Sequence, residues 1–270
     1  MLIQTLLGKR DLLIPYFRFS LVLRQNVDEI LLKEIFKLRY EVYCLERQFL
    51  PQEEFQNGLE SDEYDACSVH VAAFSTEDII IGTVRLVQPN PDQIYPFESH
   101  CSVFEDYQMP PREQAGEVSR LVVRKTHRRR RGDSMEGVSA DFIEKANATS
   151  IKPHPGGKQR DGNSPMLLLG LYREIYRHSR RNGVRYLYAA MERSLARSLN
   201  KMGFVFVPIG PQTDYYGPVT PFILDLDELD RRLRSDNEFL AAWFTDKPLP
   251  FFLILKTVFN NWWKDFRKKK

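Results

Sequence analysis

Three β-rich segments follow one another in the first half of the chain, and they constrain the fold more than any other feature. They are SVHVAAF (68–74), IIIGTVRLV (79–87) and GEVSRLVVRK (116–125). In the first segment Val69, Val71 and Ala73 alternate with polar or small residues, as in a half-buried strand. Only residues 75–78 separate the first two segments. We therefore predict a hairpin of neighbouring strands, followed by a third strand.

Helical patterns precede and follow these strands. From Asp28, apolar residues recur every three or four positions and predict an amphipathic helix that ends near Glu46. A second helix is predicted over 165–183, with Pro165 in its first turn and Gly183 at its end. A buried strand (184–191), a short helix (194–204) and two strands (205–210 and 221–226) follow. This order predicts an α/β fold with a mixed sheet.

Composition is typical of a globular protein. The 270 residues are 43% hydrophobic and 28% charged, which excludes a disordered or collagen-like chain and is enough for a sizeable core. Residues 144–164 are polar and rich in turn-forming residues, which predicts a long loop. No repeat or long linker divides the chain, so we predict one domain over 1–235 and an aromatic, basic tail over 236–270.

Cysteine usage and hydropathy predict a cytoplasmic protein. The three cysteines (Cys44, Cys67 and Cys101) are too few and too scattered for a disulfide framework. Charged residues at positions 9–11 interrupt the apolar N-terminal run, unlike in an export signal. The sequence also lacks the uninterrupted apolar stretch of about 20 residues that a transmembrane helix needs.

Positive charge gathers in two places. The segment RKTHRRRR (124–131) has six positive charges, and KDFRKKK (264–270) has five positive charges and one negative. The net charge of the whole chain is only +3, so the remainder is acidic. Such basic patches attract anions: nucleic acid, anionic lipid, a phosphate-bearing cofactor or an acidic carrier protein.

A set of charged and aromatic residues in the first half follows the order of a known signature. Its members are Arg39, Tyr43, Phe49, Asp62, Asp65, the segment GTVRL with Arg85, Glu117, Ser119 and Arg120. This set resembles the acyl-homoserine-lactone autoinducer synthases of the Gcn5-related N-acyltransferase (GNAT) superfamily, over residues 38 to 123. The likeness is closer to the exosortase-associated (PEP-CTERM) acyltransferases and the long-chain N-acyl amino acid synthases. Tyr43 and Phe49 stand where lactone synthases usually have Phe and Trp, which implies a different amine-side pocket.

The resemblance implies a GNAT-like, mostly antiparallel sheet and direct attack of an amine on a thioester, without a covalent enzyme intermediate. Glu117 is the predicted general base, with Glu113 as a second candidate, and Ser119 and Arg120 belong to the same catalytic group. Glu117 and Arg120 would point to opposite faces of a regular strand, because their separation is odd. A β-bulge would bring them together, so we predict an irregularity between Glu117 and Val123.

On the acceptor side, the resemblance implies a network of balanced charge. Its members would shape the amine pocket, hold the helix to the sheet as buried ion pairs, or do both. They are Arg39, Tyr43, Phe49, Asp62, Asp65 and Arg85.

On the donor side, the superfamily has a phosphate-binding turn after its central strand. The segment RRRRGDS (128–134) is a near match. The predicted carrier-binding residues are Arg128, Arg129, Arg130, Arg131, Gly132 and Ser134. One phosphate needs fewer arginines, which favours an acidic acyl carrier protein as the donor over acyl-CoA. The predicted acyl pocket comprises Leu167, Leu168, Leu171, Tyr186, Tyr188 and Met191.

Other sites are not indicated. The five histidines have no paired metal-ligand spacing, so we predict neither a metal nor a tightly bound cofactor. Cys44 has no matching base nearby for nucleophilic catalysis. The tail combines an apolar stretch, Trp262, Trp263 and a basic end. It is predicted either to make peripheral contact with the inner face of the cytoplasmic membrane or to dock on the body.

The predicted function is transfer of a long-chain acyl group from acyl carrier protein to the amine of an amino acid or related metabolite. The alternative within this class is homoserine-lactone synthesis from S-adenosylmethionine. An alternative of another class is a non-catalytic lipid- or partner-binding module on the same fold. A nucleic-acid binder is not expected, because no aromatic stacking face or recognition helix accompanies the basic cluster.

Overall fold

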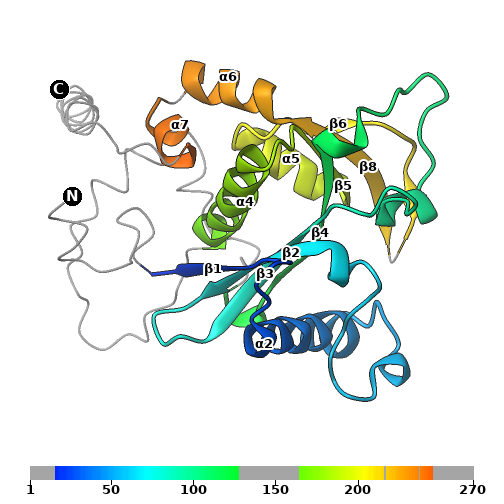
Figure 1. The fold of residues 1–270 in the computed structure, drawn as a ribbon, viewed down its shortest axis with the longest axis vertical. Helices are drawn as coiled ribbons and strands as arrows, with labels where there is room; N and C mark the ends of the chain where they lie inside the picture. Colours follow the sequence, from blue (N-terminus) through cyan, green and yellow to red (C-terminus); the bar gives the residue numbers. More distant parts are fainter. Residues whose placement is uncertain (1–15, 128–163, 216, 237, 246–270) are drawn as a thin grey trace, which may run out of the picture.

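The computed structural model describes residues 16–127, 164–215, 217–236 and 238–245. Their strands form an eight-stranded sheet in the order β1-β2-β3-β4-β5-β8-β6, with β7 paired to β8 (Figure 1). All pairs are antiparallel except β4 and β5, which are parallel. The strands are β1 (Arg18–Val22), β2 (Ser68–Phe74), β3 (Ile80–Val87), β4 (Ala115–Val123), β5 (Tyr186–Met191), β6 (Val207–Pro208), β7 (Thr213–Asp214) and β8 (Pro218–Asp225). The predicted mixed, mostly antiparallel sheet is confirmed.

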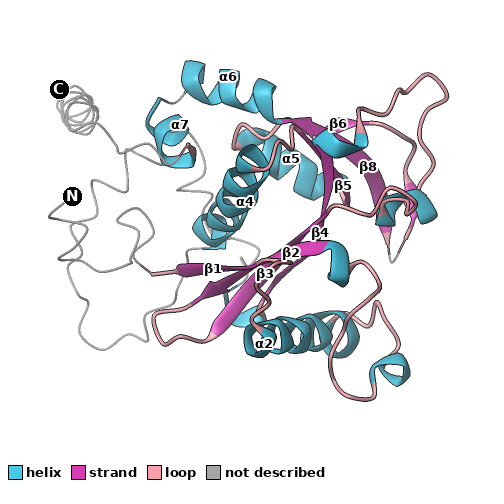
Figure 2. Ribbon diagram, viewed as in Figure 1, coloured by secondary structure: helices cyan, strands magenta, loops and turns pink. Residues whose placement is uncertain are grey.

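Helices cover both faces of this sheet (Figure 2). Helix α2 (Glu29–Tyr40) begins at Asp28, whose side chain accepts a hydrogen bond from Leu31 N, and continues as a π-helix, η1 (Glu41–Glu46). The opposite face carries α4 (Ser164–Arg181), α5 (Arg193–Lys201) and α7 (Glu238–Phe244), while α6 (Leu226–Asp236) follows β8. Short 3-10 turns occupy the loops: η2 (Gln52–Phe55), η3 (Asp65–Cys67), η4 (Pro96–Ser99), η5 (Arg112–Gln114) and η6 (Lys125–His127).

Apolar side chains gather in three clusters around the sheet. The largest lies between the sheet and α4, and it includes Leu171, Leu187 and Phe244. Two smaller clusters lie on the other face, one under α2 around Ile35 and one around Tyr188. The charged residues of the predicted acceptor network lie on this second face, beside the smaller clusters.

Strand β4 is irregular where the sequence predicted a bulge. Thr83 pairs with Val122 and Arg85 pairs with Ser119, so Arg120 and Leu121 together oppose one residue of β3. Arg120 has φ +50°, a left-handed conformation that is uncommon outside glycine. The predicted irregularity between Glu117 and Val123 is confirmed.

Strands β4 and β5 pair over only three residues. The pairing runs from Ala115 with Tyr186 to Glu117 with Tyr188, and the two strands then separate. The bulge begins just beyond this point. The second half of β4 remains paired with β3 on one side, but on the β5 side it has no paired strand among the described residues. This divergence positions the site described below.

Several elements differ from the sequence predictions. Strand β1 was not predicted, because RFSLV is short and no turn signal bounds it. The predicted strand over 205–210 is reduced to Val207–Pro208, and helices α6 and α7 were not predicted. Trp243 and Phe244 of α7 lie within the predicted tail but are buried in the main core. Residues 246–270 lie outside the described residues, so the division into domain and tail stays a prediction.

Within the described ranges, no helix is long and apolar enough to cross a membrane. The three cysteines are buried and unbridged.

Gly210 packs directly against a neighbouring loop. A Cβ at this position would lie 2.0 Å from the Ser102 carbonyl oxygen, and Phe104 N donates to Ile209 O at 2.8 Å in the same contact. We expect Gly210→Ala to lower the free energy of unfolding by about 3 kcal/mol, as overpacking against backbone does. Gly183→Ala is the comparison: a Cβ there meets nothing but must adopt φ +74°, which costs about 1 kcal/mol. Urea denaturation of both variants checks the ranking, and equal losses would contradict it.

Candidate functional site

A buried network of arginines and carboxylates joins α2, β3 and β4 to residues 51–65, which we call the acidic loop. Arg39 of α2 donates from Nε to Glu60 Oε2, and from Nη1 to Asp65 Oδ1 at 2.7 Å. Arg39 and Glu60 are almost wholly excluded from solvent. The backbone N–H of Glu60 also donates to Phe36 O at 3.1 Å, which fixes the loop against α2. These contacts hold the helix, the loop and the sheet together.

Two further arginines complete this network from the sheet. Arg85 Nη1 donates to Asp62 Oδ1 at 2.5 Å and to Asp65 Oδ1 at 2.7 Å. Arg120 Nη2 lies 2.8 Å from Asp62 Oδ2 and 3.1 Å from Glu60 Oε1. The bulge therefore places Arg120 on the same face as Arg85. We call these six residues the ion-pair network: Arg39, Arg85, Arg120, Glu60, Asp62 and Asp65.

Two carboxylates of the ion-pair network, Asp62 and Asp65, are held in their ionised form. Burial opposes ionisation of Asp65, but Arg39 and Arg85 more than offset it and hold the pKa of Asp65 well below its ordinary value. The same balance, with Arg85 and Arg120 as the cations, lowers the pKa of Asp62. Equal numbers of positive and negative groups make the network electrically balanced, which is the condition under which buried ions are tolerated.

A cavity of about 360 Å³ opens where β4 and β5 separate. We call it the wedge. Its lining includes residues 118–123 of β4, Ala189, Ala190 and Met191 of β5, and Leu195 of α5. The backbone of β4 borders the wedge on the side where strand pairing has stopped. A group that enters here meets both apolar side chains and the edge of β4.

A second cavity of about 360 Å³ lies on the other side of Arg120, against the acidic loop. We call it the acidic pocket. Its carboxylates come from that loop and its aromatic side chains from three segments far apart in the sequence. They are Glu54, Glu60, Asp62 and Glu63, with Phe55, Tyr64, His100 and Tyr215. This composition suits a positively charged amine.

Arg120 lines both cavities. Its guanidinium carbon lies 5.6 Å from the centre of the Tyr43 ring, a cation–π distance. Tyr43 and Phe49 line the wedge next to it, with ring centres 6.3 Å apart. A thioester in the wedge and an amine in the acidic pocket would therefore meet beside Arg120.

Glu117 is more deeply buried than we expect of a general base that contacts the substrate. Burial, partly offset by a hydrogen bond from Phe97 N at 3.0 Å, raises the pKa of Glu117 to about 7. Such a pKa suits proton transfer near neutral pH. The side chain is only 3% exposed, however, and it is not among the residues that line the wedge or the acidic pocket. Its visible contact is with η4, part of the wall of the acidic pocket.

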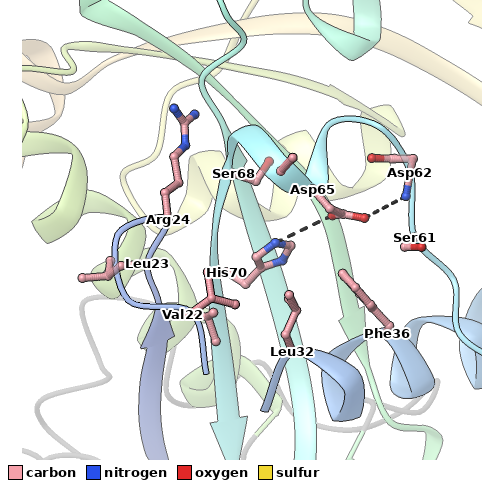
Figure 3. A pocket seen from close by; sticks show the side chains of 12 residues that line it. Val22, Leu23, Arg24, Leu32, Phe36, Ser61, Asp62, Asp65, Ser68 and His70 are labelled. Carbon is pink, nitrogen blue, oxygen red and sulfur yellow. Dashed lines mark hydrogen bonds and ion pairs between the residues drawn. The ribbon is translucent and has the colours of Figure 1, made fainter. Parts of the chain in front are cut away.

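A third cavity, of about 310 Å³, lies behind the ion-pair network. Figure 3 shows His70 at its centre, directed toward Asp65, with Asp62 and Ser61 on the neighbouring loop. His70 Nε2 lies 3.7 Å from Asp65 Oδ1, and neither ring nitrogen has a hydrogen-bond partner among the described residues. Burial lowers the pKa of His70 to about 4. The histidine is therefore neutral at pH 7 and adds no charge to the network.

The remaining predicted catalytic residues are separated in space. Ser119 accepts a hydrogen bond from Arg85 Nε at 3.1 Å and lines the wedge. Glu113 is exposed on η5, before β4 begins, and lines neither the wedge nor the acidic pocket. The six predicted carrier-binding residues between 128 and 134 lie outside the described residues. In the described part of the chain, no group of three or more His, Cys, Asp or Glu is placed to hold a metal.

The structure does not bring the predicted acyl-pocket residues into one cavity. Leu167, Leu171 and Met191 belong to the main core, with Leu168 packed against it. Tyr186 and Tyr188 lie on the opposite face of β5, in the cluster around Tyr95. Successive residues of a strand point to opposite faces, so these two tyrosines point away from the main core to which Met191 belongs. Of the six, only Met191 lines the wedge.

The sequence prediction missed Glu60 and His70. Glu60 is one of several acids between 53 and 63, and only the contact with Arg39 distinguishes it. His70 stands directly opposite Arg85 in the β2–β3 pairing, so the register of the hairpin was the one signal available.

Comparison with known proteins agrees with this architecture. Residues 38–136 match the family model of the acetyltransferase (GNAT) domain. Among solved structures, TofI in a ternary complex with an inhibitor and MTA aligns with a TM-score of 0.56 at 16% identity, over 86% of this chain and 97% of TofI. The acyl-homoserine-lactone (AHL) synthase LasI aligns with a TM-score of 0.53 at 16% identity, over 78% of this chain and 90% of LasI.

The CoA-dependent acyl-homoserine lactone synthase BjaI, with SAM and isopentyl-CoA, aligns with a TM-score of 0.54 at 19% identity, over 82% of this chain and 89% of BjaI. A comparison with curated proteins found no match. The predicted GNAT-like fold is confirmed, and the chain is similar in fold to the acyl-homoserine-lactone synthases.

The ion-pair network gives a stability prediction. Arg39→Gln leaves Glu60 and Asp65 buried without one of their cations, so we expect the free energy of unfolding to fall by about 3–5 kcal/mol. The double variant Arg39→Gln/Glu60→Gln should lose less than the sum of the two single variants, because the two residues are in direct contact. Urea denaturation of the three variants measures this coupling, and strictly additive losses would contradict it.

Glu117 gives a pH prediction. Its folded pKa of about 7 lies above the ordinary value of 4.5, so between these pH values the folded chain binds more protons at this site than the unfolded chain. The contribution of Glu117 to the free energy of unfolding therefore falls as pH rises through that window. We expect Glu117→Gln to gain about 3 kcal/mol relative to the parent between pH 4 and pH 8. The matched control is Glu113→Gln at an exposed glutamate, and similar pH profiles for both variants would exclude the proposed burial effect.

Proposed function

On the premise that the chain carries a GNAT acyltransferase domain, we propose that it transfers a fatty acyl group to the amine of an amino acid or a related metabolite. The observation that carries this proposal is the pair of cavities with Arg120 as their common wall. The wedge accepts the acyl thioester and the acidic pocket accepts the amine. Direct transfer requires both substrates to be bound together, and this arrangement provides for it.

The wedge supplies the groups that a thioester carbonyl requires. Developing negative charge on the carbonyl oxygen is stabilised by preorganised N–H donors. We assign this role to backbone N–H groups near residues 121–123 of β4, which borders the wedge and has no partner strand on the β5 side beyond Glu117 among the described residues. The amine nitrogen attacks the carbonyl carbon and the C–S bond breaks. No enzyme nucleophile is required.

An acidic acyl carrier protein is the proposed donor. Helix α5, whose Leu195 lines the wedge, has three exposed basic residues spaced four apart: Arg193, Arg197 and Lys201. Residues at this spacing lie on one face of a helix. Arg47 adds a further positive charge to the wedge lining. A carrier protein would be attracted by these charges, whereas acyl-CoA remains the alternative donor.

Homoserine-lactone synthesis is the second candidate, because LasI and BjaI, which are similar in fold to this chain, are synthases of this class. It predicts S-adenosylmethionine as the acceptor and methylthioadenosine as a by-product. The preferred reaction instead gives an N-acyl amino acid and leaves S-adenosylmethionine unconsumed. Incubation of the full chain with decanoyl-carrier protein, the common amino acids and S-adenosylmethionine, followed by mass spectrometry, distinguishes the two products. Absence of any N-acylated amine, also with decanoyl-CoA, would refute both and favour a non-catalytic binding module.

Closing the wedge should abolish transfer. Leu121 is half-buried on the bulged strand and lines the wedge, so Leu121→Trp fills part of the acyl space. We expect thiol release from decanoyl-carrier protein to fall at least about tenfold, because each excluded methylene forfeits about 0.8 kcal/mol of burial. Val207→Trp, at an exposed position on β6, is the control and should retain parental activity. Unchanged release by a folded Leu121→Trp variant would place the acyl chain elsewhere.

A further inference from the structure

The transfer proposed above requires a proton acceptor in the acidic pocket. An amine is protonated near neutral pH and attacks a carbonyl only after it loses a proton. Glu60 and Asp62 line this pocket, but both are bound to arginines of the ion-pair network. Ion pairing stabilises a carboxylate and makes it a poorer base. Glu117 does not line the pocket.

His100 lines the acidic pocket, with its side chain exposed to solvent. It follows η4, and its backbone N–H donates to Phe97 O at 3.1 Å. The imidazole stacks on Tyr215, with ring centres 3.8 Å apart and planes inclined by 12°. Stacking restricts the ring but leaves its nitrogens at the ring edge, and no hydrogen bond to them is found among the described residues.

The surroundings of His100 keep the imidazole neutral. Partial burial and the positive charge of Arg120 lower the pKa of His100 below its ordinary value of 6.5. At pH 7 the ring is therefore unprotonated and can accept a proton. The other titratable groups that line the pocket are Glu54, Glu60, Asp62, Glu63 and Tyr64, besides Arg120 and Tyr215. Glu54 and Glu63 are exposed on the acidic loop and do not stack on another ring as His100 does.

We infer that His100 is a catalytic residue that accepts the proton of the acceptor ammonium group. This inference rests on the proposed function. The ammonium gives one proton to an imidazole nitrogen, and the freed electron pair forms the C–N bond. The C–S bond breaks, a second N–H proton passes to the leaving thiolate, and the amide retains the third hydrogen. The imidazolium then returns its proton to solvent. Glu117 is left with a positioning role, since it binds the backbone of the turn that precedes His100.

The test compares His100→Gln with the parent, using the full chain, decanoyl-carrier protein and the acceptor found by mass spectrometry. We expect kcat to fall about 100-fold or more with KM changed less than about threefold, which is the range of general-base catalysis. The acidic limb of the parent pH profile, with a midpoint below 6.5, should disappear in the variant. His178→Gln, on α4 and outside both cavities, is the matched control and should keep the parental profile.

Chemical rescue separates proton transfer from a structural role. Free imidazole should restore part of the activity of His100→Ala, and it should leave the parent unchanged. His100→Asn replaces His100→Gln if the latter does not fold. A variant at His100 that retains activity within about threefold and keeps the acidic limb would overturn the inference while the proposed function stands. A parent chain that forms no acylated amine overturns both.

Discussion

The site depends on one constraint: three guanidinium groups and three carboxylates lie buried or partly buried in one place. Isolated, each buried ion would cost several kcal/mol, so the six are tolerable only as a complete, well-aligned set. The requirement that all six groups be paired fixes the backbone around them. The acidic loop must bring Glu60, Asp62 and Asp65 inward, and β4 must bulge so that Arg120 reaches the face occupied by Arg85. The left-handed conformation of Arg120 is the local cost of this arrangement.

In the proposed function, the same network determines where the substrates lie. Arg120 emerges from it as a wall between the wedge and the acidic pocket, and Asp62 connects that wall to Arg85. Glu117 lies three residues before Arg120 on β4. It accepts a hydrogen bond from Phe97 N, in the turn that precedes His100. In this proposal, β4 positions the donor cavity, the acceptor pocket and the proton acceptor.

Much of the fold could be predicted from local patterns, because β2, β3, β4, α4 and β5 each have a strong apolar period and clear turn signals. The bulge could be predicted because the family resemblance places Glu117 and Arg120 in one catalytic group although they are an odd number of residues apart. Burial of Glu60 and the place of His70 depend on strand register and loop path, which are long-range properties. Strand alternation alone could have predicted that Tyr186 and Tyr188 lie on the opposite face of β5 from Met191. The six acyl-pocket residues were grouped by hydrophobicity, and in the structure they do not line one cavity.

The short parallel contact between β4 and β5 has a mechanical consequence. Strands β1 to β4 form one half of the sheet and β5 to β8 the other, and within the described residues the two halves are hydrogen-bonded to each other only over Ala115–Glu117 and Tyr186–Tyr188. A sheet with so narrow a seam bends there more readily than within either half. The wedge begins at the end of that seam, so a small rotation of one half against the other changes the width of the wedge most at the end far from the seam.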